Sequence, residues 1–416
     1  MEYKKYVIDN VEIYTYKTDK FKTIKINMMF INEYSSEDIL YNNLLNKVLY
    51  KSTKTCNDEI KMNKKYMELY SPGLRIFDMY KNISEKNFQY TFLNEKYTEK
   101  EQNKNNIDFL FDIIFNPNIK NKKFEKNNFL LCKNDLKINY NLALENPNFL
   151  VDINSFSNIS EDLPSKILMS TDIKKLDDIN EKNLYNYYIN FLNTSSLKIF
   201  IVGDINEKQI INILKDKLKN FKFKNNDLEI QEYTLINKSI TNEIRMHKDF
   251  NQSILKLIYK VLNITDYERK YVFPLFNIIL GGNNFKLYKN VREKNSLSYY
   301  IYSRYNKFES IFSIECGIKK ENYNKTLSII YKQLKNMQES IISNKELRNA
   351  KELIIASENN IYDNLNSILS ELINVSHLKT DDNEEYIKKI KSVKISDIVN
   401  LANKINLDVL FFLEGN

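Results

Sequence analysis

The chain has 416 residues, of which 43% are hydrophobic and 13% aromatic, so it can build substantial cores. At roughly 150 residues per domain, this length suggests two or three domains. The net charge of +8, from 62 Lys and Arg against 54 Asp and Glu, is mild for so long a chain and does not indicate nucleic-acid binding. The aromatic content and the interspersed charges exclude a wholly disordered chain.

No segment approaches the ~18 apolar residues that a membrane-spanning helix needs. The first residues, MEYKKYVIDN, contain no apolar stretch after their charges, so we expect no secretory signal peptide. Cys56, Cys132 and Cys316 are scattered, with no C-x-x-C pair and no even disulfide framework. Together these features predict a soluble, cytoplasmic protein.

The first half of the chain alternates strand and helix patterns. Residues 21–31 predict a strand, and an acidic segment after Ser35 opens a helix that reaches residue 50 with apolar residues at helical spacing. The further predictions for this half are strands at 75–80 and 88–93, a helix at 106–115, an apolar strand at 197–202 before Gly203, and a helix at 207–221.

The second half repeats this order. It predicts strands at 250–259, 298–304, 311–318 and 409–413, with helices ending at residue 280 and spanning 323–337. The offset is about 229 residues between the first strands (250 − 21) and about 225 between Glu68 and Glu293 (293 − 68). We therefore predict an α+β fold of two homologous domains, each with an antiparallel or mixed sheet packed against helices. The predicted boundaries are 1–221, a linker at 222–240, and 241–416; the alternative is coincidence in a biased composition.

Histidine is scarce in this chain. His247 and His377 are the only two, they are far apart, and a catalytic zinc site usually takes two or three His ligands. We expect both to be surface or hydrogen-bonded polar residues. The Lys-rich segment 119–126 is interpreted as a solvated face in preference to a nucleic-acid patch.

Glycine is also scarce, so each of the six glycines should answer a backbone need. Gly281 and Gly282 follow the helix that ends at residue 280, and a helix stop is the favoured interpretation. A loop shaped around a bound peptide is the alternative. Neither a phosphate-binding P-loop nor a G-x-G-x-x-G fingerprint is present.

The segment from residue 280 to 299 carries a specific resemblance. It runs LGG, FKLY and VREKNSLSY in the order and spacing of the second-domain signature of insulinase-like (pitrilysin-type) zinc peptidases. The duplicated plan extends this resemblance over nearly the whole chain. Residues 68–74 and 111–117 also resemble a bacterial subgroup named for the aminopentanol modification of elongation factor P.

The resemblance implies an H-x-x-E-H zinc motif on the first long helix, at residues 42–53. The three motif positions here are Asn43, Asn46 and Lys47. Asn is a poor zinc ligand, its amide is no general base, and Lys puts a positive charge where the metal would sit. The catalytic zinc site is therefore expected to be absent, and no cofactor is expected on this chain.

The resemblance also implies roles for Arg292 and Tyr299. In the family, the matching Arg and Tyr face the zinc site, bind the substrate backbone and help to stabilise the transition state. From the residues alone, Arg292 could instead pair with Glu293 or Glu315, and Tyr299 could be an ordinary tyrosine of a half-buried strand.

These features predict a non-catalytic subunit of a heterodimeric insulinase-like metallopeptidase. Its partner would be a homologous subunit bearing the zinc motif and the zinc ion, and the two would enclose a peptide substrate. One alternative is a binding or assembly scaffold with no role in proteolysis. Another is an autonomous peptidase with a non-standard metal site. No nucleic acid or membrane partner is expected.

Overall fold

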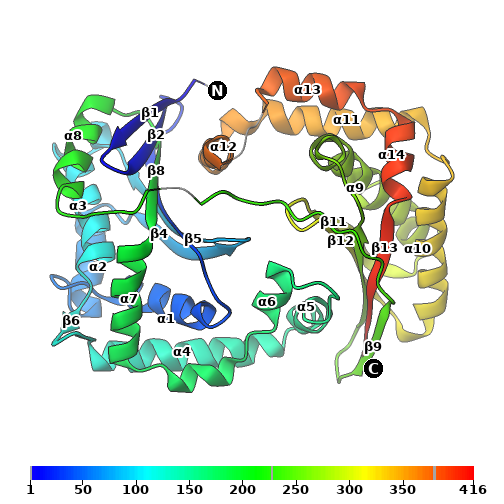
Figure 1. Cartoon of the computed structure of the whole chain (residues 1–416), viewed down its shortest axis with the longest axis horizontal. Coiled ribbons are helices and arrows are strands. Elements are labelled where there is room, and N and C mark those ends of the chain that lie inside the picture. The colour runs from blue at the N-terminus through cyan, green and yellow to red at the C-terminus, as the bar shows by residue number, and fades with distance from the viewer. Residues whose placement is uncertain (1, 226–227, 378–380) are drawn as a thin grey trace. The chain divides into compact units, whose positions relative to one another are not determined.

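We describe the protein from a computed structural model, which covers residues 2–225, 228–377 and 381–416 (Figure 1). The chain forms two compact units, each assembled from three segments. Unit 1 comprises Met1–Tyr140, Thr171–Ile230 and Ile361–Thr380, and unit 2 comprises Asn141–Ser170, Gln231–Asn360 and Asp381–Asn416. Among the residues described, we find no helix with the length and apolar character that a membrane crossing would require.

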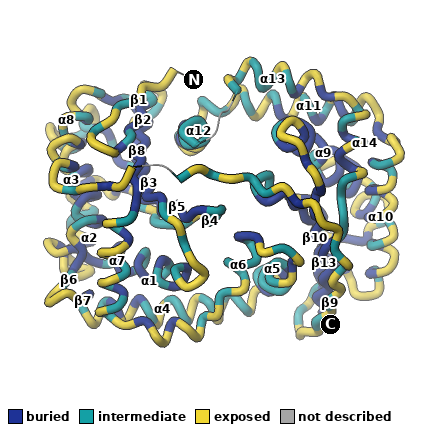
Figure 2. Tube along the Cα trace, in the orientation of Figure 1, coloured by how far each residue is buried: buried dark blue, intermediate teal, exposed yellow. Residues whose placement is uncertain are grey.

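Unit 1 is built on a six-stranded sheet with the order β1-β2-β8-β3-β5-β4. Only β2 and β8 pair in parallel; the other neighbours are antiparallel. The central strands are buried along nearly all of their length (Figure 2). The strands are β1 (Lys4–Ile8), β2 (Val11–Lys17), β3 (Thr23–Asn32), β4 (Gly73–Tyr80), β5 (Ser84–Leu93) and β8 (Ser196–Gly203).

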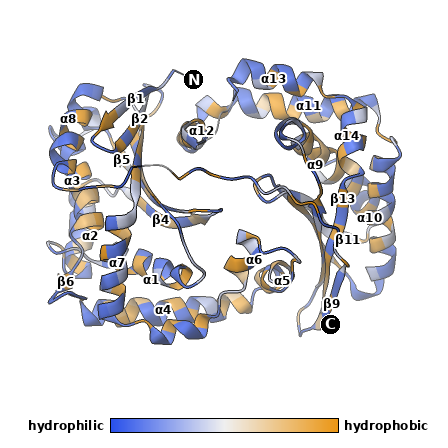
Figure 3. Ribbon diagram, in the orientation of Figure 1, coloured by the Kyte–Doolittle hydropathy of each residue, from blue (hydrophilic) through white to orange (hydrophobic). Residues whose placement is uncertain are grey.

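Helices cover one face of this sheet. Because successive strand residues point to opposite faces, Ile24, Ile26 and Met28 of β3 join the core beneath these helices. The helices are hydrophobic on the side that packs and hydrophilic on the other (Figure 3). They are α1 (Asp38–Lys51), α2 (Glu59–Glu68), α3 (Gln102–Phe115), α4 (Lys126–Leu144), α7 (Glu181–Thr194) and α8 (Glu207–Leu218). Short elements η1 (Glu95–Tyr97), β6 (Ile119–Lys120), β7 (Lys123–Phe124) and η2 (Ile173–Asp178) connect them.

The other face of the unit 1 sheet is covered by a helix from the far end of the chain. This helix, α12 (Leu365–His377), follows the short η6 (Ile361–Asp363). Its Ile368, Leu369 and Leu372 form a second core with Met29, Ile31, Phe200 and Val202 of the sheet.

Unit 2 repeats the plan with a five-stranded sheet in the order β11-β12-β10-β13-β9. Only β13 and β9 pair in parallel. The strands are β9 (Asn242–His247), β10 (Ser253–Val261), β11 (Ser298–Asn306), β12 (Ile311–Ile318) and β13 (Ile405–Glu414). One face packs on α9 (Phe273–Gly281), α10 (Tyr323–Gln338), α11 (Asn344–Asn359), α13 (Asn383–Ser392) and α14 (Ile395–Ala402), together with η3 (Glu268–Val272) and η4 (Tyr288–Glu293). The short η5 (Lys320–Asn322) leads into α10.

The other face of the unit 2 sheet is covered by a helix from the first half of the chain. Leu150 and Val151 of α5 (Pro147–Phe156) pack on Ile254, Ile258 and Phe411. The short α6 (Pro164–Met169) follows it. Each half of the chain therefore gives a helix to the sheet of the other half.

The predicted α+β class, with two domains of sheets packed on helices, is confirmed. The compact units differ from the predicted boundaries 1–221 and 241–416, because residues 141–170 belong to unit 2 and residues 361–377 belong to unit 1. The predicted linker 222–240 contains no helix or strand among its described residues, and residues 226–227 of it lie outside them. The predicted helix ending at residue 280 begins with the π-helical η3.

Candidate functional site

The helix α1 carries the positions of the degenerate zinc motif. Its buried side consists of apolar residues such as Leu44, Leu45 and Val48, which fix the helix against the sheet. Asn43, Asn46 and Lys47 are half-buried beside this apolar side. The sequence therefore folds as the expected motif helix, but none of the three motif residues carries a side chain typical of a zinc site.

Asn46 belongs to a buried polar cluster with two strand residues, Asp78 of β4 and Lys86 of β5. The Asn46 amide donates to Asp78 Oδ2 at 2.6 Å, and Lys86 Nζ donates to Asn46 Oδ1 at 2.5 Å. Lys86 Nζ lies 2.8 Å from Asp78 Oδ1, and the two side chains are 1% and 2% exposed. Burial lowers the pKa of the Lys86 ammonium, and the Asp78 carboxylate opposes that shift.

This cluster does not fit a zinc ion. Asp78 is the single carboxylate in it, and that carboxylate already neutralises a buried ammonium. In the described part of the chain, no group of three or more His, Cys, Asp or Glu side chains could hold a metal ion. Lys86 was not predicted as a site residue, and it stands in the polar first part of β5, SEKN, where nothing in the sequence marks it as buried.

The second candidate region begins at the glycine pair. A Cβ on Gly281 would lie 2.1 Å from Ser303 Oγ, so this glycine permits the close approach of α9 to β11. Gly282 is the C-cap of α9, and its N–H donates to Ile278 O at 2.9 Å. The pair thus ends the helix, as the favoured interpretation predicted, but Gly281 also has a packing reason that only the structure reveals.

Arg292 lies on η4, shortly after the glycine pair. Its side chain is exposed, and the guanidinium carbon lies 5.1 Å above the ring centroid of Tyr288. No ion pair joins Arg292 to a carboxylate within the residues that the structure describes. Glu315 is instead bound by Lys256 at 3.0 Å and by Tyr302 at 2.6 Å.

Tyr299 is the second residue of β11, and it is 63% exposed. Its β11 strand is an edge strand, as β4 is in unit 1. Backbone hydrogen bonds join η4 to the residues just before β11. Leu297 N donates to Val291 O, and Ser296 N donates to Arg292 O, both at 3.0 Å. Arg292 and Tyr299 are therefore held on one continuous, hydrogen-bonded segment, with both side chains facing solvent.

The two histidines differ in their surroundings. The His247 side chain is 64% exposed, with Nδ1 3.8 Å from Glu414. The His377 side chain is 4% exposed, and its Nε2 lies 3.7 Å from the Glu85 carboxylate. Burial, and then the nearby Lys198 and Lys81 ammoniums, lower the pKa of His377 to about 3. His377 is thus a buried neutral residue, not the surface residue that was one of the two expectations.

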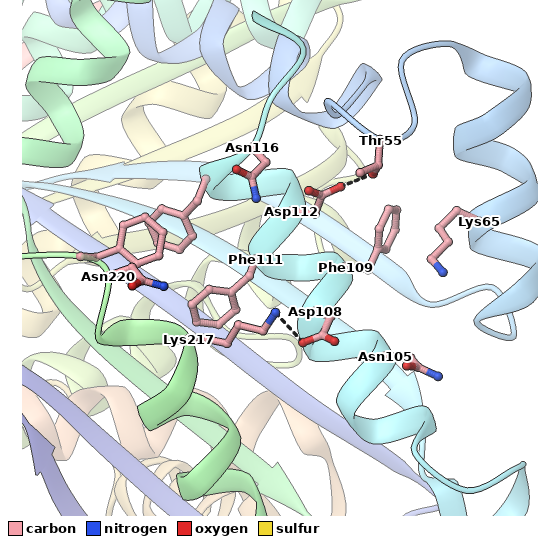
Figure 4. A pocket seen from close by; sticks show the side chains of 12 residues that line it. Thr55, Lys65, Asn105, Asp108, Phe109, Phe111, Asp112, Asn116, Lys217 and Asn220 are labelled. Carbon is pink, nitrogen blue, oxygen red and sulfur yellow. Dashed lines mark hydrogen bonds and ion pairs between the residues drawn. The ribbon is translucent and has the colours of Figure 1, made fainter.

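A cavity of unit 1 lies over α3, beside α2 and α8, with a volume of about 600 Å³. Figure 4 shows Asp108 pointing to Lys217 and Asp112 pointing to Thr55. The Asp108 to Lys217 distance is 2.7 Å. Because Lys217 pairs with Asp108 and Lys65 pairs with Glu68, this cavity does not indicate a particular ligand.

Comparisons with known proteins point to one family. Residues 178–354 match the family model described as the Peptidase M16 inactive domain. A Bacillus subtilis protein named "Probable inactive metalloprotease YmfF" is 25% identical over 410 residues, covering 96% of this chain and 94% of that protein. The chain is similar to insulinase-like M16 peptidases. The predicted family resemblance is confirmed, and the chain is of the inactive, M16 peptidase-like kind.

Solved structures show the same fold. A conserved protein from Enterococcus faecalis is 26% identical and matches with a TM-score of 0.88 over 100% of this chain and 99% of its own. An M16 inactive domain from Pseudomonas fluorescens matches with a TM-score of 0.80 at 15% identity, again over 100% of this chain and 99% of its own. At 15% identity, the match to the Pseudomonas fluorescens domain is evidence for the fold alone. The resemblance to the elongation-factor-P subgroup stays a prediction.

Proposed function

We propose that this chain is a non-catalytic subunit of a heterodimeric insulinase-like metallopeptidase. In this role it helps to enclose and bind a peptide, and it supplies Arg292 and Tyr299 to the active site of a homologous, zinc-bearing partner. The observation that carries the proposal is the contrast between two regions. Arg292 and Tyr299 are exposed and form no ion pair or side-chain hydrogen bond with the described residues, whereas Lys86 and Asn46 fill the motif region with a buried ammonium and an amide.

The chemistry of the two exposed side chains suits this role. A guanidinium and a phenol can both donate hydrogen bonds to a peptide carbonyl and to the oxyanion that develops from it. Because β11 is an edge strand, it has backbone groups beside Tyr299 that no neighbouring strand pairs with. An extended peptide could pair with these groups as a further strand of the sheet. Both groups can bind a peptide, whereas the activation of water would come from the zinc ion of the partner.

A cytoplasmic location is part of the proposal. It is supported by Cys56, Cys132 and Cys316, which are all free and buried. Unpaired cysteines are typical of reducing compartments.

The experiment is to purify the chain alone and together with a zinc-motif homologue from the same genome, and to measure bound zinc and peptide cleavage. We expect no cleavage by the chain alone and cleavage by the mixture. In the mixture, Arg292→Ala and Tyr299→Phe should each lower kcat by about tenfold or more while the complex still forms. Arg304→Ala, an exposed arginine on the same strand as Tyr299, is the matched control and should leave kcat unchanged.

Two outcomes would contradict the proposal. Stoichiometric zinc or chelator-sensitive cleavage in the lone chain would indicate an autonomous peptidase with a non-standard metal site. A complex whose activity is indifferent to both Arg292→Ala and Tyr299→Phe would favour the alternative, in which the chain is a binding or assembly scaffold.

A further inference from the structure

A basic cavity lies on unit 2 beside η4 and α10, and neither Arg292 nor Tyr299 lines it. Among its lining residues are Lys286, Lys289, Lys294, Lys332 and Glu346, the only charged ones, so their net charge is 4 − 1 = +3. Its volume of about 360 Å³ falls within the range of small-molecule sites, roughly 300–1,000 Å³. The cavity should therefore attract a small anion.

The single carboxylate is already occupied. Glu346 accepts hydrogen bonds from the backbone N–H and the hydroxyl of Ser343, both at 2.8 Å, as the capping box of α11. Glu346 also lies 3.2 Å from Lys286 Nζ. Burial raises the pKa of Glu346, but the bonds from Ser343 and Lys286 outweigh it and hold that pKa below its usual value. Glu346 thus stays ionised and neutralises Lys286, which is 7% exposed.

The remaining three lysines have no such compensation. Lys289, Lys294 and Lys332 are exposed, and no carboxylate of the described residues lies within ion-pair distance of any of them. By contrast Lys335, on the same helix as Lys332, lies 3.5 Å from Glu339. Three lysines without an ion pair around one cavity are an unbalanced positive charge in a chain whose charges are otherwise interspersed.

The π-helical turn of η4 places two of these lysines together. Lys294 N donates to Lys289 O at 2.9 Å, which is the bond between residues five apart that defines a π-helix. In an α-helix, residues five apart lie about 140° apart around the axis, so Lys289 and Lys294 would point in different directions. The wider turn brings both to the same cavity, and such turns frequently occur at functional sites.

The floor of the cavity is held by amide hydrogen bonds. The Asn290 amide donates to Lys286 O at 2.7 Å and to Gln333 Oε1 at 3.2 Å. Gln333 is 5% exposed, so this contact ties η4 to α10 from within. The hydrogen bonds of Asn290 therefore hold η4 and α10, which carry Lys289 and Lys332, in a fixed relation to each other.

We propose that this cavity binds a linear di- or triphosphate group. Lysine ammoniums bind phosphate as strongly hydrated point charges, whereas planar carboxylate recognition favours the arginine fork, which this cavity lacks. A chain of two or three phosphates presents more anionic oxygens in a row than a single phosphate does, which suits lysines carried by both η4 and α10. This site is independent of the proposed peptidase role.

The test is calorimetric titration of the full chain with inorganic tripolyphosphate and, separately, with ATP at about 50 mM salt, where screening is weak. We expect binding at one site per chain. The variant Lys289→Gln/Lys294→Gln should weaken it by about tenfold or more, because two charge-assisted contacts are lost. If ATP and tripolyphosphate bind with equal affinity, the phosphate chain alone is the recognised group. If ATP binds more tightly than tripolyphosphate, the ligand is a nucleotide.

The matched control is Lys238→Gln/Lys319→Gln, which removes the same charge from exposed lysines outside the cavity. It should bind as the unaltered chain does. The proposal is overturned if tripolyphosphate does not bind, if both double variants weaken binding equally, or if a short oligoaspartate peptide binds as tightly as tripolyphosphate. Equal weakening would mean that only the overall positive charge matters.

Discussion

Lys86 is the residue whose side chain should matter most to the stability of unit 1. Lys86→Met would leave Asp78, which is 2% exposed, as a buried charge without its cation. Breaking a buried pair on one side typically costs about 3–5 kcal/mol. Urea denaturation, followed at the transition of unit 1, should show a loss of this size. Lys65→Met is the control, because Lys65 and Glu68 form an exposed pair at 3.5 Å, and it should cost under about 1 kcal/mol.

A second variant separates charge from packing at this position. Lys86→Met/Asp78→Asn removes both charges and should recover more than half of the lost stability, because no uncompensated charge remains. If Lys86→Met alone is as mild as Lys65→Met, the cluster of Asn46, Asp78 and Lys86 is not the buried ion pair described above.

Burial of His377 should make the stability of the fold depend on pH. In the unfolded chain a histidine has a pKa of about 6.5, and in the folded chain the pKa of His377 is about 3. Between these values the unfolded state binds a proton that the folded state excludes. Stability is therefore lost as the pH falls from about 6.5 towards 3, by about 1.4 kcal/mol per pH unit from this group.

The measurement is the urea midpoint at about pH 7 and about pH 5. His377→Gln should reduce the difference between the two, whereas His247→Gln, at a side chain that is 64% exposed, should leave it unchanged. An unaltered difference in His377→Gln would show that His377 is protonated in the folded chain.

Sequence patterns identified the motif positions on α1 but did not identify the residues that contact them in the folded chain. Asn43, Asn46 and Lys47 could be found because they stand at positions i, i+3 and i+4 of one helix, the spacing of the H-x-x-E-H motif. Asp78 and Lys86 could not, because they reach Asn46 from strands 32 and 40 residues further along the chain. Contacts of that separation are set by strand register, which a single sequence does not specify.

At the scale of elements, Gly281 and Gly73 should respond oppositely to the same substitution. A Cβ on Gly281 would lie 2.1 Å from Ser303 Oγ and 2.4 Å from Ser303 N, so Gly281→Ala must push α9 away from β11. Overpacking of this kind typically costs about 1–3 kcal/mol. A Cβ on Gly73 would have no atom within 4 Å, so Gly73→Ala should leave stability unchanged or slightly raised. Thermal unfolding of both variants checks this, and equal melting temperatures would refute the close approach.

Apolar elements were predicted more readily than polar ones. β8 and β13 contain continuous apolar runs and α1 has apolar residues at helical spacing, so each is visible in the sequence. The edge strands β1 and β9 are mostly exposed and carry charged residues, so no pattern marks them. The π-helical turns were also missed, because one inserted residue does not change the hydrophobic period enough to be seen.

At the scale of the whole molecule, the duplication is visible in the sequence but the exchange of helices is not. The repeated strand and helix order predicts two similar domains. It does not predict that α12 packs on the unit 1 sheet or that α5 packs on the unit 2 sheet. Both helices are amphipathic. An amphipathic pattern predicts that one face of a helix is buried, but it does not predict which sheet or helix that face packs on.

The exchange predicts that neither half of the chain folds alone. A fragment of residues 1–221 lacks α12, so Met29, Ile31, Phe200 and Val202 would be exposed to water. Burying an apolar side chain of this size is worth about 1.5–3 kcal/mol, so losing the contacts of Ile368, Leu369 and Leu372 removes stabilisation comparable to that of a whole domain. A fragment of residues 241–416 lacks α5 in the same way.

Circular dichroism during urea unfolding should show no cooperative transition for either fragment alone. The two fragments refolded together should regain one, because each then receives its missing helix. As a control, the intact chain can be cut once within the linker 222–240. The two pieces should elute together on gel filtration in buffer and separate only in denaturant. A sharp independent transition in either fragment would mean that the exchanged helices are accessory to its fold and that the two halves are autonomous domains.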